Sequence, residues 1–162
     1  MALLQQNWYN HEGLRYFKKD SFDFKLETIG VYTNEELVYK ACGILIEKLR
    51  YIHDNIDETG VIEKSISTIP NSVDITLKNT GYTVGKIIEY ILHKNNYQGA
   101  LNKNLTYVGF RKNHPHDEDS VIRMGIKNGS GDETNHQIAL ANMQEACNNA
   151  IEVVSGIMTE FS

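Results

Sequence analysis

Several residue types are scarce in this 162-residue chain, and each scarcity excludes a class of protein. Two prolines are well below the usual share of about 5%, which leaves little material for a proline-rich linker. The two cysteines, Cys42 and Cys147, form no CxxC pair, so they do not have the pattern of a zinc site, and buried free thiols are expected. No apolar run approaches the ~20 residues that a membrane-spanning helix needs.

Basic charge is missing from the last part of the chain. Residues 128–162 carry five acidic residues and no Lys or Arg, and the whole chain has 16 basic and 21 acidic residues. A protein that binds nucleic acid by itself needs a basic stripe that displaces counterions from the phosphates. The sequence has no such stripe, so independent binding of DNA or RNA is not expected.

Motifs of common enzymes and of secretion are also missing. Residues 81–87 have three rather than four residues between their glycines, and Ile87 follows Lys86, so they do not form a phosphate-binding loop. No nucleophile elbow or paired carboxylates stand in a recognisable frame, so neither a catalytic residue nor a cofactor is predicted. The first residues lack a signal peptide, which favours an intracellular, reducing compartment.

What is present is the composition of a globular domain, 41% apolar and 23% charged. Residues 22–27 alternate apolar and polar side chains, which predicts a half-buried strand. Thr33, followed by two glutamates, resembles a helix start, and the apolar spacing after it predicts a helix of about twenty residues. The polar residues 54–60 mark the expected boundary between a first segment, 1–60, and a domain, 61–162.

The second segment has its own order of elements. Strands are predicted at about 72–78, 105–111 and 120–127, the last two joined by a polar turn at 113–119. A short helix capped by Thr80 or Thr83 lies between the first two strands, and Asp132 is expected to cap a long last helix. The predicted fold is therefore α+β, with a mixed or antiparallel sheet packed on long amphipathic helices.

Two glycines lie inside predicted helices. Gly43 and Gly85 each cost roughly 1 kcal/mol of helix stability relative to alanine. A missing Cβ lets two helix backbones approach closely, so both positions are candidates for helix–helix crossings. Tolerated sequence drift is the equally weighted alternative.

One polar cluster raises a catalytic alternative. Residues 114–119 contain two histidines and three carboxylates, and a small metal-dependent hydrolase could use His114, His116 and Asp117. Six consecutive residues of one turn do not easily surround an ion, however, and no distant motif completes the ligand shell. A solvated turn is therefore the favoured interpretation.

Three stretches carry a resemblance to a known family. Residues 79–88 read NTGYTVGKII, residues 107–115 read YVGFRKNHP, and residues 121–124 read VIRM. In this order they resemble the smaller partner of the RNA polymerase assembly heterodimer, the family of the eukaryotic eleventh subunit and archaeal subunit L, related to the bacterial alpha subunit's N-terminal domain. The family's His-Thr-Leu-Gly is Tyr82-Thr83-Val84-Gly85 here. The resemblance covers about residues 61–162.

A second resemblance covers the front of the chain. Residues 22–30, FDFKLETIG, and the helix after Leu37 are similar to the last strand and helix of the larger partner, the third subunit or archaeal D. The presence of both partner segments in one chain resembles the fused subunits of nucleocytoplasmic large DNA viruses of the asfarvirus type. The larger partner's earlier elements are absent, so either the chain is the C-terminal part of a longer polypeptide or another chain supplies them.

The resemblance implies a non-catalytic subunit of a DNA-directed RNA polymerase. It would form the alpha-like dimerisation platform on which the large catalytic subunits assemble, with DNA contacted only through the complex. If the chain is viral, the resemblance implies that it is found in the host cytoplasm and in the virion. Otherwise it implies the nucleus or the cytoplasm. A freestanding homodimeric adaptor of the same fold, or the hydrolase above, is the alternative.

The resemblance also assigns residues to two surfaces. The implied dimerisation interface, formed with the remaining half of the platform, comprises Leu37, Ala41, Gly43, Ile44, Leu45, Leu49, Thr83, Val84, Gly85, Ile88, Ile91, Leu140, Cys147, Ile151 and Val154. The implied contact with a large subunit comprises Gly109, Phe110, His114, Pro115 and Arg123.

Overall fold

The computed structural model describes residues 2–17, 19, 21–58, 61–99 and 103–162. The chain forms two compact units, residues 1–34 and 35–162. This division differs from the expected boundary after residue 60, because the helix that follows residue 34 belongs to the larger unit. No helix in the described ranges is long and apolar enough to cross a membrane.

The first unit contains little regular structure. Helix α1 (Ala2–Asn10) and the 3-10 helix η1 (Gly13–Arg15) are joined by aromatic contacts of Trp8, whose ring centroid lies 5.3 Å from that of Tyr9 and 6.0 Å from that of Tyr16. The sequence did not predict this helix. The strand predicted at 22–27 is wrong: the segment pairs with no strand in the described part of the chain, and Phe24 is 93% exposed. A strand needs a hydrogen-bonded neighbour, and the alternating pattern alone does not provide one.

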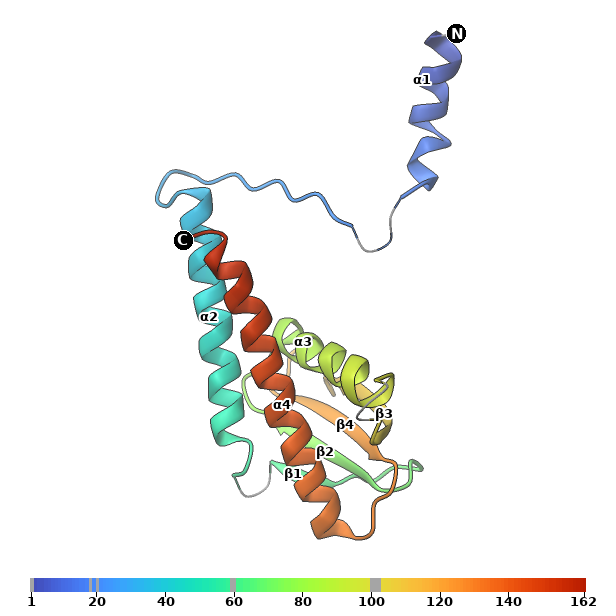
Figure 1. The fold of residues 1–162 in the computed structure, drawn as a ribbon, viewed down its shortest axis with the longest axis vertical. Coiled ribbons are helices and arrows are strands. Elements are labelled where there is room, and N and C mark those ends of the chain that lie inside the picture. The colour runs from blue at the N-terminus through green and yellow to red at the C-terminus, as the bar shows by residue number, and fades with distance from the viewer. Residues whose placement is uncertain (1, 18, 20, 59–60, 100–102) are drawn as a thin grey trace. The chain divides into compact units, whose positions relative to one another are not determined.

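The second unit is an α+β domain with a four-stranded antiparallel sheet (Figure 1). Its strands stand in the order β1 (Ile62–Lys64), β2 (Ser72–Leu77), β4 (Ser120–Ile126) and β3 (Leu105–Arg111). The three predicted strands and the β3–β4 hairpin are confirmed. Strand β1 was not predicted, because three residues are too few for a pattern of period two to be visible.

Helices α3 (Tyr82–Leu92) and α4 (Asp132–Thr159) cover one face of this sheet, and α2 (Asn34–Asn55) lies beside α4 (Figure 1). All three were predicted, but the caps expected for α3 and α4 are wrong. Gly81 and Gly131 precede α3 and α4 without a side-chain cap, and Asp132 is already the first residue of α4. A short π-helix, η2 (His93–Tyr97), which the sequence did not predict, continues α3.

The core lies between the sheet and the helices. Alternate residues of β2 and β4 point into it, including Ile75, Ile122 and Met124, and the helices supply Ile88 and Met143, all fully buried. Burial of such side chains is the main favourable contribution to folding, at about 1.5–3 kcal/mol each. Both cysteines are buried free thiols, as expected, and burial raises the pKa of Cys147 to about 12.

A buried amide cluster joins η2 to α4. The Asn96 and Asn104 side-chain amides both donate to Asn142 Oδ1, at 3.1 and 3.0 Å. Asn96 and Asn142 are 2% and 4% exposed, so these bonds replace those that water would make. The cluster explains why this polar stretch is ordered against the helix.

Candidate interaction surfaces

The structure divides the predicted dimerisation residues into three groups. Six are buried inside the second unit, namely Leu49, Val84, Gly85, Ile88, Cys147 and Val154. Six are half-buried, namely Leu37, Gly43, Leu45, Ile91, Leu140 and Ile151, and three are exposed, namely Ala41, Ile44 and Thr83. Much of the predicted interface is therefore an internal contact between helices of one chain.

That internal contact joins α2 to α4. Cys42 and Ile46 of α2 form a cluster with Val154 of α4, and Asn148 of α4 lies 3.4 Å from the His53 ring of α2. Glu35 at the start of α2 and Met158 at the end of α4 line one common hollow. The two helices are therefore antiparallel along most of α2.

The buried side of α2 only partly matches the predicted one. Leu49 is buried as predicted, whereas Ala41 and Ile44 are exposed, and Cys42 and Ile46 are buried instead. Since successive residues are 100° apart around a helix, the centre of the buried face lies to one side of the predicted stripe. Apolar side chains occur on both sides, so the sequence pattern alone did not place the edge of the buried face.

The two helical glycines have different surroundings. A Cβ at Gly85 would overlap the ring of Phe110, which comes from β3, whereas a Cβ at Gly43 would meet open space. Gly85 thus permits the close approach of a strand side chain rather than of a helix, and a Cβ at Gly43 would contact no helix of the described residues. Phe110 also makes an edge contact with Tyr82, and it points toward α3 rather than toward a free surface.

The sheet face opposite α3 and α4 carries a row of polar residues. Strand register aligns Glu63, Asp74, Arg123 and Gly109 across all four strands. Arg123 binds the Asp74 carboxylate with two hydrogen bonds, Nε at 2.6 Å and Nη2 at 2.7 Å, and Arg111 lies 3.5 Å from the same carboxylate. The bond from Arg123 holds the pKa of Asp74 below its usual 3.8, although burial opposes this shift. We call this the outer sheet face.

Two predicted large-subunit contacts, Gly109 and Arg123, lie on the outer sheet face. His114 and Pro115 lie in the exposed turn between β3 and β4, and Phe110 is on the other side of the sheet. The structure thus brings together two of the five residues on one face and places two more in the adjoining turn. The sequence missed Asp74, whose role depends on strand register.

The 114–119 cluster uses its polar atoms to close this turn. Asp117 accepts a hydrogen bond from the His114 backbone N–H at 2.8 Å, and His114 Nδ1 accepts one from the His116 N–H at 3.2 Å. Asp119 accepts a bond from the Asn79 N–H at 2.9 Å. Within the described residues, no group of three or more His, Cys, Asp or Glu is placed to hold a metal ion. The geometry gives the hydrolase hypothesis no support.

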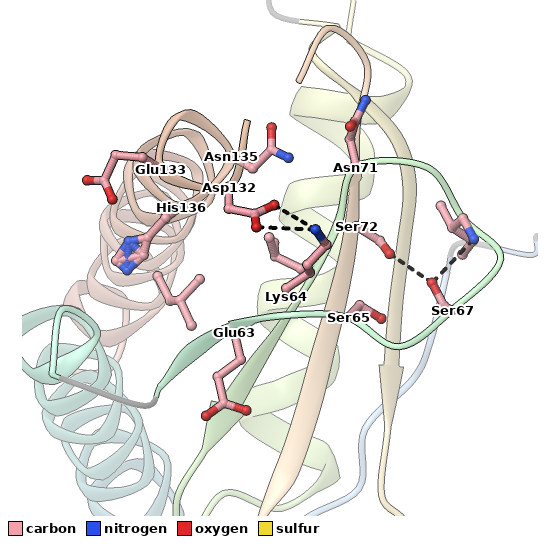
Figure 2. Close-up of a pocket in the computed structure, with 13 residues that line it drawn as sticks. Glu63, Lys64, Ser65, Ser67, Asn71, Ser72, Asp132, Glu133, Asn135 and His136 are labelled. Atoms are coloured by element: carbon pink, nitrogen blue, oxygen red, sulfur yellow. Dashed lines mark hydrogen bonds and ion pairs between the residues drawn. The ribbon is translucent and has the colours of Figure 1, made fainter. Parts of the chain in front are cut away.

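Figure 2 shows a pocket of about 310 Å³ between β1, the 65–71 loop and the first turn of α4. Lys64 on one wall binds the Asp132 carboxylate on the other, at 3.0 and 3.2 Å, and Ser67 bonds Ser72 at 2.8 Å. Among the described residues, Asn135 Oδ1 has no hydrogen-bond partner, and it is buried beside Gly129. The sequence missed this pocket because it missed β1. The Lys64–Asp132 ion pair across it joins β1 to α4.

Two comparisons of the sequence with known proteins found no relative. No protein-family model matches the sequence, and the search of curated proteins also gives no match.

Proposed function

We propose that the chain is a non-catalytic subunit of a DNA-directed RNA polymerase and forms an alpha-like platform for the large catalytic subunits. The antiparallel packing of α2 on α4 carries this proposal. By the sequence resemblance, α2 corresponds to the last helix of the larger partner and α4 to the last helix of the smaller one. In that family the two partners pack helix on helix, and here the two corresponding helices do so within one chain.

The outer sheet face supports the same proposal. The platform of this family presents its sheets to the large subunits, and the chain leaves Arg111 51% exposed there, beside the Asp74–Arg123 pair. Because both oxygens of the Asp74 carboxylate are engaged, the guanidinium of Arg123 is fixed against the strands. The Asp74–Arg123 pair and the exposed Arg111 are the charged groups that this face offers to a protein partner.

The experiment is affinity purification of the tagged full-length chain from its native cells, with mass spectrometry of the bound proteins. We expect the two large polymerase subunits to be recovered. The double variant His114→Ala/Pro115→Ala in the exposed turn should reduce that recovery. Lys127→Ala, exposed just past the other end of β4, is the matched control and should not. A wild-type chain that recovers no large subunit overturns the proposal.

A further inference from the structure

Helix α2 has a second apolar stripe outside the core. Its members, which we call the α2 outer stripe, follow each other at intervals of four, three, four and three residues and are Leu37, Ala41, Ile44, Lys48 and Tyr51. Ile44 is 54% exposed and Tyr51 59% exposed, and Ala41 and Lys48 are exposed as well. This spacing is the heptad pattern with which one helix packs along another. The opposite side of α2 packs on α4, whereas Lys48 and Tyr51 border an open hollow whose other wall is formed by residues 78–81.

We propose that the α2 outer stripe binds the same stripe of a second copy of this chain, with the two helices antiparallel about a twofold axis. The stripe is complementary to itself in shape. When the axis passes near residue 46, Ala41 of each copy lies opposite Tyr51 of the other, so the smallest side chain meets the largest. Ile44 then lies opposite the aliphatic stem of Lys48. A twofold interface requires such matching, because the same patch serves both copies.

The stripe is also complementary to itself in charge. Glu47 borders the stripe next to Lys48. In the same antiparallel register, the ammonium of Lys48 lies beside Glu47 of the other copy, and the twofold axis repeats this pair. A lysine in an otherwise apolar seam usually selects one register and one partner at some cost in stability. These pairs favour a second copy over an unrelated apolar helix.

The size of the contact sets its strength. Four turns of one helix bury less than the ~1,600 Å² of a standard interface, so we expect a reversible dimer whose population depends on concentration. This inference does not rest on the polymerase proposal, since a self-associating chain could serve either as a polymerase subunit or as a freestanding adaptor.

Sedimentation velocity of the full-length chain over a concentration series tests the proposal. The wild type should shift from monomer to dimer across micromolar concentrations. Ile44→Asp places two charges in the seam and should raise the dimer dissociation constant about tenfold or more. Tyr39→Asp is the matched control, because Tyr39 is a 41% exposed apolar residue of the same helix outside the stripe, and it should dimerise like the wild type. A wild type that stays monomeric throughout overturns the proposal, as does equal weakening by both variants.

Charge reversal tests the register. Lys48→Glu and Glu47→Lys should each weaken the dimer, and the double variant should restore it, since opposite charges face each other again. Failure of the double variant to recover overturns the antiparallel register. Circular dichroism checks that each variant is folded. If Ile44→Asp does not fold, Ala41→Glu at a second exposed stripe position gives the same measurement.

Discussion

The two units of the chain treat similar apolar side chains in opposite ways. Residues 1–34 contain Leu4, Phe22, Phe24 and Ile29, and every described large apolar side chain of this unit is exposed. Residues 35–162 bury many of theirs in one main core and a smaller α2–α4 cluster. The difference teaches that an apolar pattern leads to burial only where the chain also supplies the packing partner, as β4 does for β2.

The largest expected contrast comes from matched truncations in the two units. Ile88 is fully buried, so Ile88→Ala should lower the free energy of unfolding by about 2–5 kcal/mol. Phe24→Ala removes a larger side chain that is 93% exposed and should change it by less than about 0.5 kcal/mol. Urea denaturation measures both. A loss of stability in the Phe24 variant comparable with that of the Ile88 variant would contradict the difference drawn between the two units.

A smaller contrast separates the two helical glycines within the second unit. Gly85→Ala pushes a methyl group into the Phe110 ring and should destabilise by about 1–3 kcal/mol. Gly43→Ala has open space at its Cβ and should stabilise the helix by about 0.5–1 kcal/mol. Thermal unfolding should therefore show shifts of opposite sign. Two shifts of the same sign would mean that Phe110 yields easily or that α2 is constrained at Gly43.

The pH dependence of stability should come from the second unit. Since the folded pKa of Asp74 lies below its unfolded value, its contribution is present above about pH 4 and is lost as the pH falls through the folded pKa. Asp74→Asn should cost about 1.5 kcal/mol at neutral pH and should make unfolding less sensitive to acid. Urea titrations at several acidic pH values measure this. Parallel acid profiles for wild type and variant would refute the role of the Asp74–Arg123 pair.

The smallest expected effect is deletion of most of the first unit. Removal of residues 1–30 keeps Thr33 and the whole of α2, and it should change the free energy of unfolding of the remainder by less than about 0.5 kcal/mol. Equilibrium denaturation of the shortened chain measures this. A large destabilisation would show that the first unit packs on the second.

Patterns in the sequence predicted most elements of the second unit. The strands at β2, β3 and β4 and the helices α2, α3 and α4 follow from periodicity, because the sheet has one buried face and each helix packs one side on the core. Strand β1 and the π-helix were too short or too irregular to produce such a pattern. The buried face of α2 was assigned only in part, because apolar residues also line its exposed side.

The candidate surfaces were less predictable than the fold. Arg123 and Gly109 were expected at a surface and lie on the outer sheet face, but their alignment with Asp74 depends on strand pairings between distant segments. Phe110 was expected beside them, yet residues of one strand alternate between faces, and it points toward α3. Register, which a single sequence does not determine, decided each of these outcomes.

The two buried thiols can report on local opening of the folded chain. Cys147 of α4 is fully buried, and its raised pKa keeps it a thiol rather than the reactive thiolate at neutral pH. Cys42 belongs to the separate cluster that joins α2 to α4. A thiol reagent added to the native protein should therefore label Cys42 whenever α2 separates from α4, and Cys147 only when the main core opens. The ratio of the two labelling rates would measure how independently α2 moves.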